Sequence, residues 1–184
     1  MCTQAIHPAI EFLQHLDPSD DAVFNLQHHT DLPPSKERPK PDPLLRVYSG
    51  LRIFDVEQLI PTLHAFNDRG AGIFVARNQC AGHRSEKNVV RVRGVHADMD
   101  DVSEEQLAGL MTALPPSIVV ESSAGRYQLY WQLAEGQTLS KEEAKAINQC
   151  LSREYGADPA AVDVARLLRL PGFKHMKYRS QTHD

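Results

Sequence analysis

The chain has 184 residues and a formal net charge of −4, with 41% hydrophobic and 24% charged side chains. This length corresponds to about one domain at roughly 150 residues per domain, and a mean hydropathy of −0.41 without any apolar stretch near ~20 residues excludes a transmembrane helix. The N-terminal region lacks the apolar core of a secretion signal, and the three cysteines form no close pair. We therefore expect a cytoplasmic protein with no membrane partner and no disulfide framework.

The first part of the sequence predicts two helices, two strands and one irregular segment. Pro8 is a favourable first-turn residue, and apolar residues recur at helical spacing until Asp17 and Pro18. Five prolines between residues 32 and 43 exclude a regular helix or a central strand there. In chain order, we expect a helix at 8–16, a strand at 22–27, an exposed proline-rich loop at 32–43, a helix capped by Asp55 and ended by Gly70, and a strand at 72–77.

The second part predicts two capped helices among strands. Ser103 with Gln106, and Ser140 with Glu143, match the capping box that begins a helix. In chain order, we expect a polar loop at 79–88, a strand at 89–99, a helix with Leu107, Leu110, Met111 and Leu114 on its buried face, strands at 117–121 and 128–133, a helix with Ala144, Ile147, Leu151 and Tyr155 on its buried face that ends at Gly156, and a helical turn opened by Asp158. Because strands and helices do not alternate strictly, this order favours an α+β fold over a doubly wound parallel sheet.

The strongest chemical signal is the acidic end of the predicted strand at 89–99. Residues two apart on a strand face the same side, so Asp98 and Asp100 would project together, with α-carbons roughly 6.5 Å apart at ~3.3 Å per residue. Such a pair, joined by a third carboxylate, can hold two Mg²⁺ or Mn²⁺ ions ~3.5–4 Å apart. A solvated strand end before the helix that follows is the alternative that spacing alone leaves open.

Asp163 is the candidate third carboxylate, because it interrupts an apolar stretch in which an unpaired acid would be costly. It could instead cap the following turn or pair with Arg166 or Arg169. The turn at 121–128 offers hydroxyls, backbone amides and a guanidinium, a combination that can bind a triphosphate or simply form a hairpin. Acids cluster at 98–105 and bases at 164–179. This segregation suits a site where cations lie between carboxylates and phosphates, although solvated charged faces give the same pattern.

Two other candidates are weaker. Cys80 and His83 have ligand-like spacing, but no second pair follows, which favours a loop thiol and an exposed imidazole over a zinc site. His28 and His29 are adjacent, and adjacent strand positions face opposite ways. We interpret His28 and His29 as surface residues.

Five segments, taken in order, resemble one family. They are GAGIFV at 70–75, KNVVRVR at 87–93, ADMD at 97–100, VVESSAGRYQLYW at 119–131 and DPAAVDVARLLRLPGFKH at 158–175. Over nearly its whole length the chain resembles the RepB-like DNA primase domains of plasmids, phages and integrated elements, within the archaeo-eukaryotic primase superfamily. The ordered combination is far more specific than any one motif.

The resemblance implies an α+β core in which an α/β unit packs on an RRM-like unit with a mixed or antiparallel sheet, and in which metal and nucleotide lie between the two. It implies one catalytic domain over residues 1–184, which could be the excised core of a longer protein. The family's acidic motifs fall on Asp98, Asp100 and Asp163, which the resemblance makes the catalytic metal ligands. Asp101 lies beside the first motif and is interpreted as a loop residue.

The family's middle motif carries a histidine and falls on the turn at 122–128, where this chain has Gln128 at the histidine position. An amide can donate to phosphate but cannot become cationic, so triphosphate affinity is the property that this departure affects. The residues implied for the triphosphate or the template backbone are Ser122, Ser123, Arg126, Gln128, Arg166, Arg169, Lys174 and His175.

The function implied is that of a DNA primase or primase-polymerase, which makes or extends short primers on single-stranded DNA during plasmid, phage or mobile-element replication. Its cofactors would be two divalent ions, Mg²⁺ or Mn²⁺, and its substrates NTPs or dNTPs. A replicative helicase or a C-terminal helical domain would be the further partner. Two alternatives stay open: a non-catalytic nucleic-acid-binding module of replication initiation, and a metal-dependent nuclease.

Overall fold

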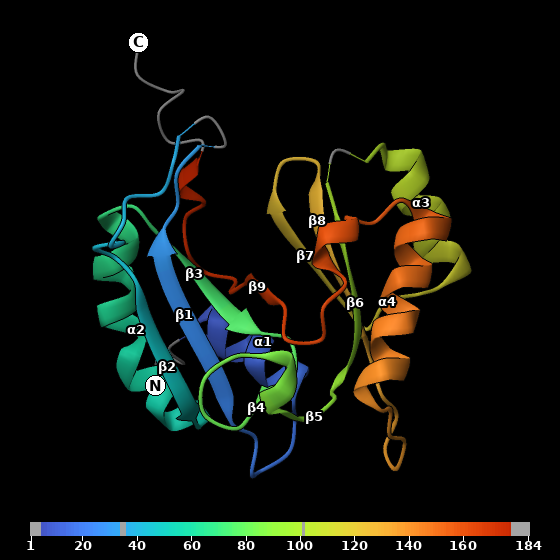
Figure 1. Ribbon diagram of the computed structural model, residues 1–184, viewed down its shortest axis with the longest axis horizontal. Helices are drawn as coiled ribbons and strands as arrows, with labels where there is room; N and C mark the ends of the chain where they lie inside the picture. The colour runs from blue at the N-terminus through green and yellow to red at the C-terminus, as the bar shows by residue number, and fades with distance from the viewer. Residues whose placement is uncertain (1–4, 34–35, 101, 178–184) are drawn as a thin grey trace. The chain divides into compact units, whose positions relative to one another are not determined.

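The computed structural model describes residues 5–33, 36–100 and 102–177, which form two compact units (Figure 1). Unit 1 contains the described residues up to Val75 and from Arg169 onward, and unit 2 contains Ala76–Leu168. The elements of unit 1 are α1 (Pro8–Leu16), β1 (Phe24–Thr30), β2 (Arg46–Leu51), α2 (Ile53–Asp68) and β3 (Ala71–Ala76), whose last residue already belongs to unit 2. The elements of unit 2 are β4 (Gln79–Cys80), the 3-10 helix η1 (Glu86–Asn88), β5 (Val89–Arg91), β6 (Gly94–Met99), α3 (Glu104–Ala113), β7 (Ile118–Ser123), β8 (Arg126–Gln132), α4 (Lys141–Tyr155), the 3-10 helix η2 (Pro159–Ala161) and β9 (Leu167–Arg169), which ends at the unit boundary.

Three sheets organise the described residues. One has four strands in the order β2-β1-β3-β9, a second pairs β4 with β5, and a third has the order β6-β8-β7. β1 is antiparallel to both β2 and β3, and β8 is antiparallel to both β6 and β7. The predicted α+β class is therefore confirmed. Among the described residues, none of the helices combines the length and the apolar composition that a membrane crossing requires.

In unit 1, the helices α1 and α2 contact each other and contribute buried side chains to its core. α1 buries most of its apolar residues, as its helical spacing predicted, and α2 buries Val56 and Leu63. His28 of β1 belongs to this core: it is fully buried, its Nδ1 donates to the Leu44 carbonyl oxygen at 2.6 Å, and its ring packs against Phe66. Our interpretation of His28 as a surface residue was therefore wrong, because a backbone acceptor satisfies the ring inside the core. His29 is also partly buried, with its ring stacked on that of Phe74.

The core of unit 2 lies between the sheet β6-β8-β7 and the helices α3 and α4, which Figure 1 shows beside that sheet. Met99 and Leu129 from the sheet and Leu110 and Leu151 from the helices are buried in it. Cys80 is also buried in this core, so the expectation of a loop thiol was wrong.

Several predicted helix boundaries are confirmed. The structure has both reciprocal hydrogen bonds of the capping box at Ser103 and at Ser140. Gly156 ends α4 with a left-handed backbone (φ 75°), and the Asp158 side chain caps η2. These boundaries depend on contacts within one helical turn, which a sequence shows directly.

Other predicted elements differ in detail. The strand expected at 89–99 is divided into β5 and β6. The division occurs because the Arg93 N–H donates to Asn78 Oδ1 at 2.7 Å and Gly94 has a φ of 147°. α2 begins after Arg52 and not at Asp55, whose carboxylate instead accepts the Arg52 N–H from the first turn. β2 was missed, since it is an edge strand with mostly exposed residues and no regular apolar alternation.

The buried faces of α3 and α4 are also narrower than their apolar patterns predicted. Met111, Leu114, Ile147 and Tyr155 are all more than a third exposed. α4 buries Asn148 instead, a polar residue that the apolar pattern passed over.

Candidate active site

The pairing of β6 with β8 places the first predicted acid beside the residue at the histidine position of the family motif. Asp98 lies directly opposite Gln128 in this antiparallel pair, and side chains at such positions have β-carbons roughly 4.5–5.5 Å apart on one face of the sheet. Gln128 is buried, and its Oε1 accepts a hydrogen bond from the Tyr130 hydroxyl at 3.3 Å. The structure thus brings Asp98 and Gln128 together on neighbouring strands.

Asp98 sits in an environment that disfavours its charge. Burial raises the pKa of its carboxyl from 3.8 to about 6, and the negative charge of Asp100 adds to the effect, while Arg166 opposes it. A half-buried carboxylate beside a second acid is typical of a site that takes up a cation. The neighbouring ring of His96 is fully buried, which lowers its pKa to about 3 and keeps it neutral.

Asp100 is the more accessible member of the pair. Its side chain is 45% exposed, and its Oδ2 accepts a hydrogen bond from Arg126 Nη1 at 2.9 Å. Arg126 begins β8, and the hairpin between β7 and β8 holds it there. In this structure Arg126 therefore neutralises Asp100, and a phosphate would have to compete for it.

Two hydroxyls precede the hairpin turn. The Ser122 hydroxyl donates to the Arg126 carbonyl oxygen at 3.3 Å, which ties it to the turn itself. Ser123 Oγ is buried and has no hydrogen-bond partner in the described chain. Buried polar atoms are normally satisfied, so Ser123 is a position where an additional acceptor or donor would fit.

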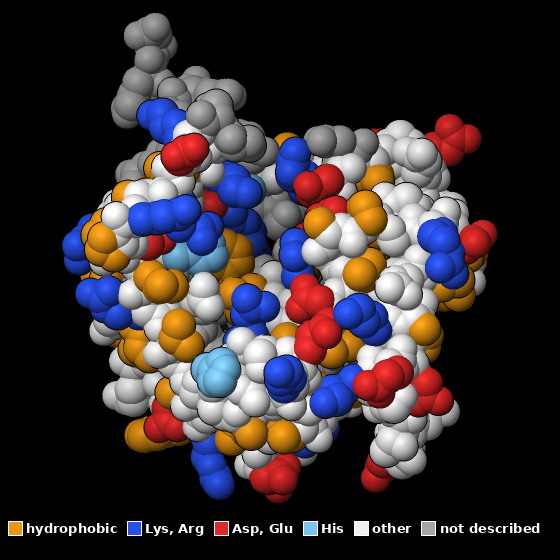
Figure 2. All heavy atoms as spheres, viewed as in Figure 1, with side chains coloured by type: hydrophobic (Ala, Val, Ile, Leu, Met, Phe, Trp, Pro, Cys, Tyr) orange, Lys and Arg blue, Asp and Glu red, His pale blue; other side chains and the backbone are white. Residues whose placement is uncertain are grey.

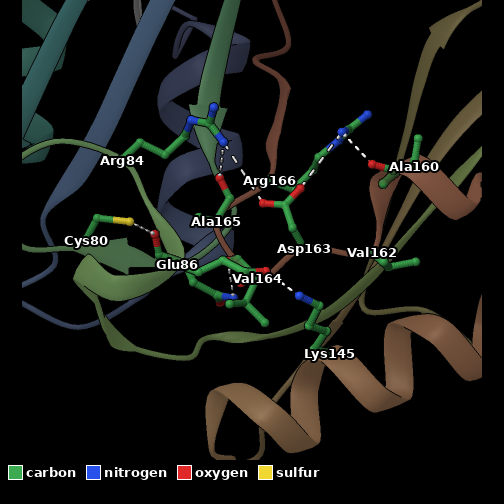
Figure 3. Close-up of polar contacts among 12 residues, drawn as sticks. Cys80, Arg84, Glu86, Lys145, Ala160, Val162, Asp163, Val164, Ala165 and Arg166 are labelled. Carbon is green, nitrogen blue, oxygen red and sulfur yellow. Dashed lines mark hydrogen bonds and ion pairs between the residues drawn. The ribbon is translucent and has the colours of Figure 1, made fainter.

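Asp163 lies between two arginines (Figure 3). Its carboxylate oxygens are 4.0 Å from Arg84 Nη1 and 3.9 Å from Arg166 Nη1. Both arginines are also anchored by main-chain acceptors, Arg84 by the Ala165 carbonyl oxygen and Arg166 by that of Ala160, at 2.9 and 2.8 Å. Pairing of Asp163 with Arg166, one of the alternatives that the sequence left open, is therefore present.

Asp158 approaches Asp98 through the main chain. The Asp158 N–H donates to the Asp98 carbonyl oxygen at 2.8 Å, and the carboxylate of Asp158 helps to raise the pKa of Asp98. Arg166 Nη2 is 3.9 Å from the Asp158 carboxylate, and Arg166 Nε is buried without a hydrogen-bond partner among the described residues. Arg166 thus lies among three acids, Asp98, Asp158 and Asp163, with one donor available for another ligand.

The acids of this site meet only part of what two divalent ions require. Within residues 5–33, 36–100 and 102–177, no three His, Cys, Asp or Glu side chains are close enough together to hold a metal ion, so Asp163 does not join Asp98 and Asp100 here. The adjacent acids, one of them with a raised pKa, still match the oxygen ligands that Mg²⁺ and Mn²⁺ prefer. Asp101, the acid beside the motif, lies outside the described residues.

The last three predicted phosphate ligands lie in unit 1. Arg169 Nη2 donates to both carboxylate oxygens of the buried Asp31 at 2.9 Å, and His175 Nε2 is 3.9 Å from the same carboxylate. Lys174 Nζ bonds Asp68 Oδ1 at 3.0 Å on the surface. Each of the three is therefore near an acid of its own unit.

Charges of both signs occur on the face of the protein that Figure 2 shows. Figure 2 shows Lys and Arg side chains among Asp, Glu and apolar side chains on the visible face. Recognition of an anionic ligand would accordingly depend on particular side chains more than on a broad basic field.

Sequence reasoning missed Arg84, Asp158 and the buried pair His96 and Asn148. Arg84 carried no motif signal, and Asp158 was predicted only to open a helical turn, because their contacts at the site are with residues far away in the chain. A sequence signal did exist for the pair: each is a polar residue at a position where the element's pattern requires a buried side chain.

Comparison with known proteins agrees with the fold and shows the family. The family described as the RepB DNA-primase N-terminal domain matches residues 65–184, and the chain belongs to this family. No curated protein matches the chain by sequence.

Solved structures of primases share the fold. The crystal structure of primase RepB' is similar with a TM-score of 0.66 and 22% identity over 92% of this chain and 50% of that one, so the chain spans about half the length of that primase. The catalytic domain of primase RepB' in complex with initiator DNA gives 0.64 and 23%, over 91% and 77% of the two chains. The archaeo-eukaryotic primase domain of the cyanophage S-2L primase-polymerase gives 0.66 and 17%, over 91% and 83%.

Proposed function

We propose that this chain is the catalytic domain of a cytoplasmic DNA primase or primase-polymerase, which joins nucleotides on a single-stranded DNA template in plasmid, phage or mobile-element replication. Family membership over residues 65–184 supports the class of enzyme. The observation that carries the site is the placement of Asp98 and Asp100 at the end of β6, with Asp98 opposite Gln128. In our proposal residues 1–184 act as one catalytic domain, which can be the core of a longer protein that contains a helical domain or recruits a helicase.

Asp98, Asp100 and Asp163 would hold the two divalent ions, Mg²⁺ or Mn²⁺. When bound, such ions lower the pKa of an attacking hydroxyl and stabilise the leaving pyrophosphate. For Asp163 to take part, its ion pairs with Arg84 and Arg166 have to loosen. Asp158 is a second acid near Asp98, since its N–H donates to the Asp98 carbonyl oxygen. The assignment of Asp163 as the third metal ligand is therefore to be compared with Asp158 in that role.

The residues around the acids would bind and orient the nucleotide. Ser123 Oγ and Arg166 Nε are buried donors without partners in the described chain, and a triphosphate offers the oxygen acceptors that they lack. The Gln128 amide can donate to the same group without adding charge. Ser122, Arg126, Arg169, Lys174 and His175 complete the proposed set for triphosphate and template, in competition with their present partners.

In the proposed reaction the 3′-oxygen of the primer or first nucleotide forms a bond to the α-phosphorus of the incoming NTP or dNTP. The bond from that phosphorus to the bridging oxygen breaks, pyrophosphate leaves with the oxygen, and the hydroxyl proton passes to water. The protein's part is mostly positioning and charge stabilisation. The relative whose crystal structure contains initiator DNA supports a DNA template for this chain.

The test is incorporation of labelled nucleotides on single-stranded DNA with Mg²⁺ or Mn²⁺, with and without an annealed primer, beside Asp98→Ala and Asp100→Ala. Metal-dependent products that vanish in both variants are expected, and full activity in either folded variant would refute the site. Products formed without a primer indicate a primase, and extension only of a primer indicates a polymerase core. Shortened strands would replace the proposal with a nuclease, and DNA binding without synthesis would replace it with a binding module.

A further inference from the structure

We propose that Asn148 and His96 are positioning residues, which hold the segment of residues 158–163 against the strand that carries Asp98. The inference deepens the proposed function, because this segment contains Asp158 and Asp163. Neither Asn148 nor His96 is acidic, and neither belongs to the primase motifs.

The first observation concerns the outer edge of β6. In the sheet order β6-β8-β7, β6 pairs with β8 on one side only. On its other side the His96 N–H donates to Asn148 Oδ1 at 3.0 Å, and the Asp98 carbonyl oxygen accepts from the Asp158 N–H at 2.8 Å. A side chain of α4 and the segment after it therefore occupy the edge where a fourth strand would otherwise pair.

The second observation is the number of bonds that Asn148 makes. It is 2% exposed and lies in the middle of α4, where a buried amide is unfavourable unless its polar atoms are satisfied. Its Nδ2 donates to the Val162 carbonyl oxygen at 3.2 Å and lies 3.4 Å from His96 Nδ1. One side chain thus connects α4, β6 and the segment 158–163.

The third observation fixes the role of the imidazole. His96 is 1% exposed, and its Nε2 is 2.8 Å from the Ala161 carbonyl oxygen. A carbonyl only accepts, so Nε2 carries the hydrogen and Nδ1 is the acceptor that faces the Asn148 amide. His96 and Asn148 therefore attach the same segment at two neighbouring carbonyl groups, those of Ala161 and Val162.

These bonds decide where the acids lie. The segment enters at Asp158, beside Asp98, and leaves at Asp163, between the two arginines. If the Asn148 amide is removed, the His96 N–H and the Val162 carbonyl oxygen lose partners in a buried place, and the segment can shift. Groups that orient ligands through hydrogen bonds typically change metal affinity by about 10–100-fold when they are mutated.

The experiment compares Asn148→Leu, His96→Leu and His96→Gln with the unchanged protein, and uses Leu110→Ala as a matched control. Leu110 is buried in α3, so its truncation should cost about 2–5 kcal/mol of stability without touching this network. The measurements are the affinity for Mn²⁺ by electron paramagnetic resonance, kcat and KM for incorporation, and hydrogen exchange of the backbone at residues 158–163. Asn148→Ser gives the same comparison if the leucine variant fails to fold.

We expect Mn²⁺ affinity and kcat to fall about tenfold or more in Asn148→Leu and His96→Leu, with a much smaller change in KM and faster exchange at residues 158–163. His96→Gln should keep most of the activity, because its amide can still donate to the Ala161 carbonyl oxygen. Leu110→Ala should lower the melting temperature but leave Mn²⁺ affinity unchanged.

Folded Asn148→Leu with unchanged Mn²⁺ affinity and unchanged exchange at residues 158–163 would overturn the positioning role, as would an equal loss of affinity in Leu110→Ala. If the unchanged protein binds no Mn²⁺ and incorporates no nucleotide, the proposed function fails instead. The exchange measurement then still decides whether Asn148 holds the segment.

Discussion

Replacing Asp98 by asparagine should stabilise the metal-free protein while it abolishes nucleotide incorporation. Burial and the charge of Asp100 raise the pKa of the Asp98 carboxyl from 3.8 to about 6. A difference of this size corresponds to about 3 kcal/mol of folding free energy that the ionised carboxylate costs. Asparagine removes the charge and keeps the shape.

The sign follows from proton linkage. The folded state holds the Asp98 proton more tightly than the unfolded state, so wild-type stability from this group falls as pH rises from 3.8 to about 6 and stays low above that. The advantage of Asp98→Asn should therefore be absent near pH 4 and complete near pH 7. After allowance for burial of the amide, we expect about 2 kcal/mol at pH 7, or roughly 4–8 °C in melting temperature for a chain of this size.

The assay is urea and thermal unfolding with a chelator between pH 4 and 8. Asp100→Asn is the matched control, since it removes the same charge from a side chain that is 45% exposed and paired with Arg126. The surface pair that it loses contributes only about 0–1 kcal/mol, and loss of the Asp100 charge also relieves its repulsion of Asp98. These two effects oppose each other, so the net change in stability should be small. Saturating Mn²⁺ should reverse the order, because only the wild type gains binding energy. A variant less stable than wild type at pH 7, or a difference independent of pH, would refute the reasoning.

Three further predictions concern stability. Gly94→Ala should lower the free energy of unfolding in urea by more than about 3 kcal/mol, because the new β-carbon would lie 2.0 Å from the Trp131 carbonyl oxygen at a φ of 147°. The control Gly109→Ala, which has open space around it in α3, should be neutral or stabilising. Equal effects of the two substitutions would contradict this explanation. Burial lowers the pKa of His29 to about 4, so the neutral ring contributes up to about 3 kcal/mol of stability above pH 6.5, which is lost as pH falls toward 4. His29→Gln should therefore make the free energy of unfolding less dependent on pH between 4 and 6.5. An unchanged pH dependence would show that another group causes it. Ser140→Ala should lower the melting temperature, because about 1 kcal/mol of helix capping is lost. The loss should be larger than in Glu143→Ala, which removes the other side chain of the capping box, and a smaller loss would show that Ser140 is not the main cap.

Local chemistry in the sequence predicted the ends of helices better than their faces. The capping boxes at Ser103 and Ser140 and the stop at Gly156 are all present, because each depends on atoms within a few residues. The exposed side of α4 was predicted less well: Ile147 is more than a third exposed, whereas Asn148 is buried. An apolar pattern shows that a helix has a buried side, but the neighbours that it contacts decide which polar residue can join that side.

The same division holds at the candidate site. The ADMD motif predicted that Asp98 and Asp100 share a face; the strand β6 contains Asp98 opposite Gln128, and Asp100 follows the last residue of the strand. The motif could not predict that Asp163 lies between Arg84 and Arg166, since Arg84 is 79 positions away in the chain. Nor could it predict that Asp158 bonds the main chain of Asp98.

The sequence alone determined the fold class, the family and the acidic strand, since these depend on local spacing and on the order of motifs. The tertiary structure decided the state of each group: that the pKa of Asp98 is raised, that Arg126 and Arg166 are engaged by acids, and that Asn148 and His96 hold the segment that carries the last two acids. The physical reason is that burial and hydrogen bonding are set by residues distant in the chain, and electrostatic energies change several-fold with the local dielectric that those residues create.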